Sequence, residues 1–201
     1  AFSPNFLAHG KVATADLACT LGCVAAIYFY HRTAVRSASL QWLPCGIATG
    51  LALLTKYTSL LLGPVFLIIG LLDAGFRQRS LSGLLFGGLT VVLCSTLIIT
   101  FAYIGDRAPG WGLIHYFERL QTLYSDHNTG LRHYLLGNTS TEPRWYYYLL
   151  TLAIKLPIGT LLLTLLGLLA LGWHPSSGQI IRYVGVPAAM ILLATCFDSV
   201  N

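Results

Sequence analysis

Lysine is the scarcest cation in this chain, and its placement is the first indication of chemistry. The sequence contains three lysines, Lys11, Lys56 and Lys155, and each lies beside or within an apolar segment. A lysine in such a place can extend its ammonium group to the lipid headgroups, which is one explanation. The alternative is that the three lysines converge on an anionic group such as a lipid phosphate, where a cation offsets the charge on a departing phosphate.

Asp16 is the second candidate, because it follows His9 and Lys11 at the start of an apolar stretch. A carboxylate in the first turn of a helix is stabilised by the helix dipole, so a structural role at the membrane interface is one explanation. A carboxylate within a membrane segment is costly and usually faces a cavity or a partner, which favours a functional acid instead. Such an acid could bind a metal or orient an acceptor hydroxyl.

The segment 105–144 mixes charged, histidine and aromatic side chains. Rings can stack on sugars and Arg can bind phosphate through two parallel hydrogen bonds, so the mixture suits sugar and phosphate recognition. Each residue is also open to a salt bridge within the loop, and His127 and His133 do not have the spacing of a metal site. The candidate side chains are His115, Glu118, Arg119, Asp126, His127, Arg132, His133, Glu142 and Arg144.

The composition requires lipid as the solvent for most of the chain. Only 9% of the 201 residues are charged and 55% are apolar, which leaves too few polar side chains to cover a soluble surface. Apolar stretches that can cross about 30 Å of hydrocarbon recur, and they predict an all-α, polytopic transmembrane bundle of four to six passes. The twelve Lys and Arg are scattered, so despite the net charge of +5 we expect no nucleic-acid partner.

The apolar stretches predict a topology for the first half of the chain. A first span over about 14–30 ends at the basic turn 31–36, which is typical of a cytoplasmic loop. The apolar region 40–73 is too long for one pass, so it predicts a helical hairpin that turns at residues 56–59. A further span over 82–103 then brings the chain to the non-cytoplasmic side.

In the second half, the segment 104–144 is predicted to be a non-cytoplasmic loop, with only a modest excess of cations on the opposite side. The aromatic cluster 145–148 is typical of a membrane interface, and Lys155-Leu156-Pro157 is expected to turn the chain into the next span. Two spans complete the chain, at about 157–173 and up to about residue 197. This topology places Asp16, Lys56, the loop and Lys155 on one side of the membrane.

Small residues predict how the helices pack. Gly46 with Gly50 and Gly83 with Gly87 form two pairs at four-residue spacing, which would let helices approach closely. No repeat, linker or low-complexity tract divides the sequence, so we expect one transmembrane domain over residues 1–201.

Four sequence elements resemble a known family. They occur in the order SPNFLAHGKVATADL, GIATGLALLTKYTSLLL, GLRHYLLGNTS and WYYYLLTLAIKLPIG. The chain resembles the protein O-mannosyltransferase-like branch of the GT-C glycosyltransferases, which includes the aminoarabinose transferases of lipid A. This resemblance implies an integral enzyme of a bacterial inner membrane or an ER-type membrane. The family uses a dolichyl- or undecaprenyl-phosphate sugar and works on the periplasmic or lumenal face.

The resemblance also implies roles for individual residues. Asp16 matches an acidic residue at the start of a helix, Lys56 the lysine of a Leu-Thr-Lys element, and Lys155 a lysine before proline. The best-known catalytic carboxylate of the family lies in its first outer loop and has no counterpart here, so we expect a fragment that is inactive alone. Asp16 is the candidate catalytic residue, in a supporting role that positions metal or substrate. The candidate substrate-binding residues are His9, Lys11, Lys56, Tyr57, His133, Arg144 and Lys155.

The resulting hypothesis is a mannosyltransferase-like membrane enzyme that moves a sugar from a polyprenyl-phosphate donor to a protein, lipid or glycan acceptor. A transporter or flippase for a lipid-linked or small polar substrate is the main alternative, because the same charges could line a pathway. A noncatalytic membrane subunit is a third. The long loop and the aromatic cluster favour the enzyme, since a rocking transporter needs neither. No cofactor is predicted with certainty, and a divalent metal is left open.

Overall fold

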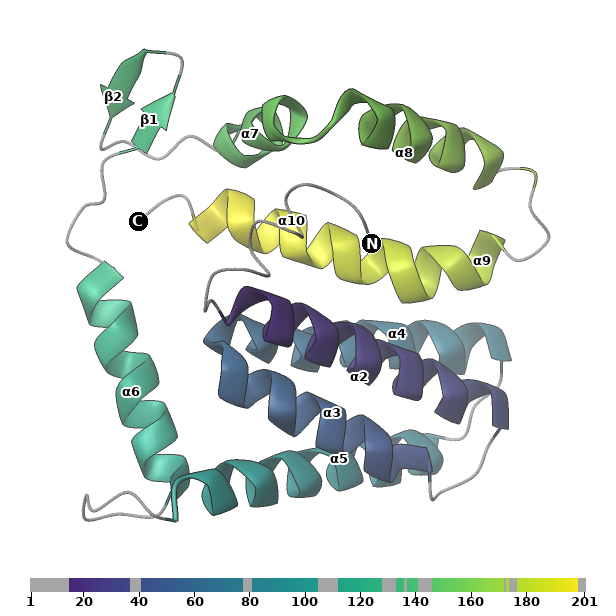
Figure 1. Cartoon of the computed structure of the whole chain (residues 1–201). Coiled ribbons are helices and arrows are strands. Elements are labelled where there is room, and N and C mark those ends of the chain that lie inside the picture. The colour runs from purple at the N-terminus through teal and green to yellow at the C-terminus, as the bar shows by residue number, and fades with distance from the viewer. Residues whose placement is uncertain are drawn as a thin grey trace. The chain divides into compact units, whose positions relative to one another are not determined.

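A computed structural model of the chain divides it into two compact units, residues 1–121 and 122–201 (Figure 1). The described residues are 15–36, 41–77, 81–104, 112–127, 133–135, 137–140, 146–171, 173 and 177–198. They are helical apart from one short hairpin, which confirms the predicted all-α class for the spanning helices. The prediction of a single domain stays a prediction.

The first unit is a bundle in which α2, α3, α4 and α5 run in alternating directions (Figure 1). Its core consists of small side chains from two neighbouring helices, Ala26, Ala48 and Ala52, together with Leu62. Small side chains let the helix backbones approach closely, so this core is formed by close packing rather than by large residues. The elements are α2 (Asp16–Arg36), α3 (Trp42–Thr55), the 3₁₀ helix η2 (Tyr57–Leu61), α4 (Leu62–Arg77), α5 (Leu81–Ala102) and α6 (Gly112–His127), whose residues up to Gln121 belong to this unit.

Glycine positions bring α3 and α5 together, as the first glycine pair predicts. A Cβ atom added at Gly46 would lie 2.6 Å from the Cβ of Cys94, and one at Gly50 would lie 3.1 Å from the Cα of Ser95. In the second pair, the ring of Trp42 occupies the space above Gly87, whereas no atom of the described residues lies within 4 Å of a Cβ atom added at Gly83. The packing prediction is therefore confirmed at Gly46, Gly50 and Gly87, and it stays a prediction at Gly83.

Gly46→Ala is expected to destabilise the bundle, because the added methyl group meets the Cβ of Cys94 and the Cα of Val91 rather than a flexible chain end. Overpacking of this kind costs about 1–3 kcal/mol, so the thermal midpoint in detergent should fall. Gly83→Ala is the matched control, since its methyl group enters open space in a helix. Equal midpoints for the two variants would contradict the close approach of α3 and α5.

The second unit contains, after the end of α6, a hairpin of β1 (His133–Leu135) and β2 (Asn138–Ser140), in which Leu135 pairs with Asn138. Gly137 in its turn has a φ of +87°, a conformation that glycine adopts without strain. Helices α7 (Tyr147–Lys155) and α8 (Ile158–Leu171) follow with a bend of 114° between them, as expected at Pro157. The unit ends with α9 (Ser177–Ile180), the π-helix η3 (Ile181–Gly185) and α10 (Val186–Asp198).

Three stretches of the described chain are long and apolar enough to cross a membrane: Tyr57–Gly75, Ser82–Ala102 and Ser177–Ala194. A fourth results if α7 and α8 form one bent span, so the predicted range of four to six passes is met only at its lower end. The predicted first span corresponds to α2, which is not among them. Asp16, His31 and Arg32 make this helix more polar than α3, α4 and α5.

The predicted loop 104–144 is more ordered than expected, because it contains α6 and the β1–β2 hairpin. Helix α6 crosses the direction of α5 in the first unit (Figure 1). Its first residue, Gly112, is seated closely on α5, since a Cβ atom there would lie 3.0 Å from the Cα of Thr100. The loop therefore positions side chains against one end of the bundle.

Candidate functional site

The structure brings together two of the predicted site residues, Asp16 and Lys56, which are 40 residues apart in the chain. The Nζ atom of Lys56 lies 2.7 Å from Oδ1 of Asp16, and the two side chains are 48% and 47% exposed. Asp16 begins α2 and Lys56 follows the last residue of α3, so antiparallel packing places both at the same end of the bundle. The two residues thus lie at one end of the bundle, as the predicted topology requires, and the role of the pair stays a prediction.

Lys56 reaches this position because the helix breaks at it. Its backbone is extended, with φ −159° and ψ 136°, between α3 and η2. The carbonyl oxygen of Ala52 accepts hydrogen bonds from the Lys56 backbone N–H at 3.2 Å and from the hydroxyls of Thr55 at 2.7 Å and Ser59 at 3.0 Å. These bonds satisfy polar groups that the break would otherwise leave without partners. The predicted turn at residues 56–59 is confirmed.

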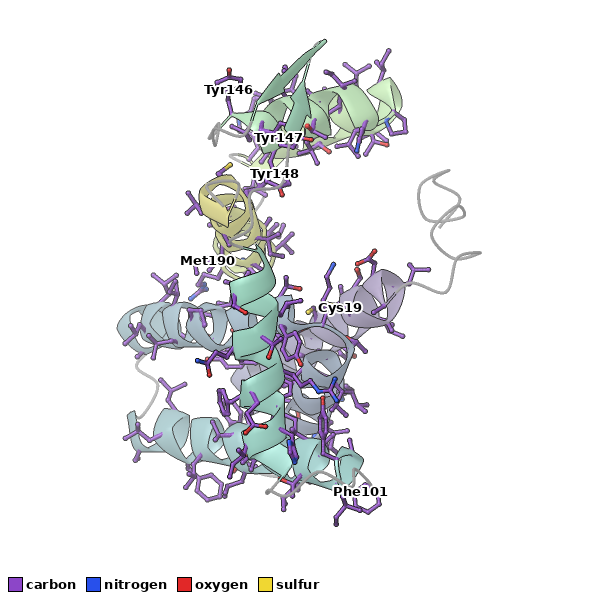
Figure 2. The ribbon with its side chains drawn as sticks, turned by 90° about the vertical axis from the view of Figure 1, so that its left-hand side faces the viewer. Cys19, Phe101, Tyr146, Tyr147, Tyr148 and Met190 are labelled. Atoms are coloured by element: carbon purple, nitrogen blue, oxygen red, sulfur yellow. The ribbon has the colours of Figure 1, made fainter. Side chains whose placement is uncertain are left out.

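Two thiols fix the register of α2 against this break. The Oγ atom of Ser59 lies 3.2 Å from Sγ of Cys19 and 3.7 Å from Sγ of Cys23. Cys19 is one helical turn beyond Asp16, on the part of α2 that Figure 2 labels. Because Asp16, Cys19 and Cys23 follow one helix face, the contacts of the thiols hold the carboxylate towards Lys56.

Aromatic side chains from α6 cover the residue after Lys56. The rings of Tyr57 and Tyr116 have centroids 5.0 Å apart, and the Tyr116 hydroxyl donates to the carbonyl oxygen of Leu53 at 3.3 Å. The side chain of Tyr57 also lies near that of Tyr103, and the charge of Arg119 acts on it. Burial, followed by the neighbouring phenols of Tyr57 and Tyr103, raises the pKa of Tyr116 to about 12.

The raised pKa of Tyr116 predicts a loss of stability at alkaline pH. An unfolded tyrosine ionises near pH 10, whereas Tyr116 stays neutral in the folded protein until about pH 12. The full stability is therefore present below pH 10 and is lost as the pH rises towards 12, by at most about 2–3 kcal/mol. Tyr116→Phe should show a shallower decline of the thermal midpoint over this range. Parallel curves for the two proteins would contradict the burial of this phenol.

Sequence reasoning selected neither Tyr103 nor Tyr116, and it named Arg119 only as one residue of the loop. The signal that could have found them is the helical spacing of His115, Tyr116 and Arg119 within one element. In that element His115 is buried and its Nδ1 lies 3.1 Å from Oε2 of the exposed Glu118. The alternative of a salt bridge within the loop is therefore confirmed for this pair.

The other predicted residues are not brought to this site by the described structure. His9, Lys11 and Arg144 lie outside the described residues, and His133 begins β1 without a described side chain. Lys155 ends α7 in the second unit, where it is exposed. Its convergence with Lys56 stays a prediction.

Other features of the second unit agree with the sequence. Tyr146, Tyr147 and Tyr148 lie at the start of α7, with the rings of Tyr147 and Tyr148 5.4 Å apart (Figure 2). The described part of the chain contains no group of three or more His, Cys, Asp or Glu side chains that could hold a metal ion. A divalent metal stays an expectation from the sequence.

Comparison with known proteins identifies the family. The model of the dolichyl-phosphate-mannose-protein mannosyltransferase family matches residues 1–103, just over half of the 201 residues. No curated protein and no solved structure matches the chain. The matched residues include both members of the Asp16–Lys56 pair, and the apolar helices agree with a multi-pass membrane protein. The chain thus belongs to the dolichyl-phosphate-mannose-protein mannosyltransferase family and is a membrane glycosyltransferase of the GT-C type.

Proposed function

We propose that this protein transfers a sugar from a polyprenyl-phosphate donor to a protein, lipid or glycan acceptor on the non-cytoplasmic side of the membrane. The observation that carries the proposal is the half-exposed Asp16–Lys56 ion pair at one end of an apolar bundle, within the part of the chain that matches the family. Charges beside membrane-spanning helices are costly to keep unless they bind a partner or a substrate.

The ion pair can bind a phosphate without being broken. An ammonium group has three N–H donors, so a phosphate oxygen can accept a hydrogen bond from Lys56 while Asp16 remains at 2.7 Å. Asp16 then orients the ammonium group, and it lies close enough to the headgroup to orient an acceptor hydroxyl as well. Its position in the first turn of α2 also places the carboxylate near the positive end of a helix dipole, where a negative charge is favoured.

In the proposed reaction, a carboxylate takes the proton of the acceptor hydroxyl as its oxygen attacks the anomeric carbon of the sugar. The bond from that carbon to the phosphate oxygen breaks, and the polyprenyl phosphate leaves with both electrons of the bond. Lys56 stabilises the charge that develops on this phosphate, together with the predicted Lys155. Positioning and electrostatics supply most of the rate, since the phosphate is already a competent leaving group.

Release of the lipid carrier is the direct test of the proposed function. The intact protein is incubated with a polyprenyl-phosphate donor that carries a labelled sugar, and free polyprenyl phosphate and labelled acceptor are measured together. Equal amounts of both products are expected from a single displacement. Movement of the intact donor across a vesicle membrane without cleavage would instead support the flippase alternative and remove this proposal.

A further inference from the structure

Helix α6 carries a second cation to the end of the bundle where Lys56 lies. Its residue Tyr116 contacts both Tyr57, the residue after Lys56, and the backbone of Leu53, near the end of α3. Gly112 seats the start of the helix on α5, and α6 then runs across the bundle end (Figures 1 and 2). About one helical turn after Tyr116, the exposed Arg119 lies close enough to Tyr57 for its charge to act on the phenol.

The charges at this end show why a second cation is needed. Lys56 is neutralised by Asp16 at 2.7 Å, so the pair as a whole offers a phosphate little net attraction. On α6, Glu118 is turned to His115, with 3.1 Å between their side chains. None of the described carboxylates forms an ion pair with Arg119. Its positive charge can therefore act on a phosphate group at this end of the bundle.

From this arrangement we infer that Arg119 binds the phosphate of the lipid-linked donor, as a partner of Lys56. The inference rests on the proposed function and extends it to an element that lies beyond the residues matched by the family. A guanidinium group presents several N–H donors in one plane and binds two phosphate oxygens through parallel hydrogen bonds, a geometry that the ammonium group of lysine does not offer. The contact between the tilted rings of Tyr57 and Tyr116 holds α6 beside the residue that follows Lys56.

The test measures binding of farnesyl phosphate, a short polyprenyl phosphate, to the intact protein in detergent. Arg119→Gln is expected to weaken binding by about tenfold, the size of one charge-assisted hydrogen bond, and to reduce its salt dependence. Arg119→Lys keeps the charge but not the planar group, so it should recover only part of the affinity. Arg32→Gln is the matched control, because Arg32 lies towards the other end of α2, over the ring of Tyr28 at 5.8 Å.

Two further ligands separate the possible sources of the phosphate. Farnesol has the same chain without the phosphate, and its weaker binding should not change in Arg119→Gln. Inorganic phosphate should compete only at far higher concentration than farnesyl phosphate. Competition at similar concentrations would indicate a site for free phosphate and would overturn the assignment to a lipid-linked donor.

The outcomes distinguish this inference from the proposed function. Equal affinity of Arg119→Gln and Arg32→Gln for farnesyl phosphate would overturn the role of Arg119 and leave the proposed function standing, provided that substitution of Lys56 still weakens binding. Farnesyl phosphate that binds wild-type protein no better than farnesol does would refute the proposed function itself. Arg119 is exposed, so its variants should keep the thermal midpoint of the wild type.

Discussion

Lys56→Met is expected to lower the rate of sugar transfer by about 100-fold, which is the effect of removing one preorganised donor that stabilises developing negative charge. Methionine has nearly the same length and fits the same space, so the change removes the ammonium group with little loss of packing. The measurement is the release of polyprenyl phosphate from a labelled donor, with kcat and KM determined separately. The loss should fall mainly on kcat, because the cation acts most strongly when the phosphate departs.

Stability should change little in the same variant. The Lys56 and Asp16 side chains are about half exposed, and an ion pair in such a place contributes about 0–1 kcal/mol. The thermal midpoint of Lys56→Met should therefore remain within a few degrees of wild type, and Arg32→Gln should change neither activity nor midpoint. Transfer at the wild-type rate by Lys56→Met would remove Lys56 from the proposed mechanism.

The break at Lys56 was predictable because it depends on local chemistry. An apolar stretch of 34 residues cannot cross a membrane once, so the chain had to turn within the region 40–73. Lys56 is the charged residue that interrupts this stretch, and the structure breaks the helix there. Pro64 lies in the first turn of α4, where a helix tolerates proline because no intrahelical partner is required there.

Helix α6 was not predicted, and the reason is physical. Its apolar side chains, such as Ile114 and Phe117, recur at helical spacing among polar ones, and this amphipathic pattern was overlooked beside the long apolar runs. Packing on the bundle end stabilises it, through Tyr116 and through the close approach at Gly112. Such contacts join segments that are far apart in the sequence, and no local pattern reveals them.

The candidate site shows the same division between local and distant effects. The scarcity of charged residues and their apolar surroundings were enough to select Asp16 and Lys56. The number of predicted spans between the two residues placed both on one side of the membrane in the predicted topology. The distance of 2.7 Å between them depends on the register of α2, which the contacts of Cys19 and Cys23 with Ser59 determine. The sequence contained these cysteines but gave no sign of their partner.

A charge exchange tests whether the ion pair binds substrate or only joins two helices. In the double variant Asp16→Lys with Lys56→Asp, the pair can form again with reversed polarity, so the thermal midpoint should remain close to wild type. Transfer should nevertheless stay about 100-fold below wild type, since the carboxylate now occupies the place beside Tyr57 where a cation is required. The single variant Asp16→Asn should lose only about tenfold, because the ammonium group remains but is less well oriented. If the ion pair only joined the two helices, the double variant would be fully active and would exceed Asp16→Asn in activity. Only the attraction between α2 and the end of α3 would then matter.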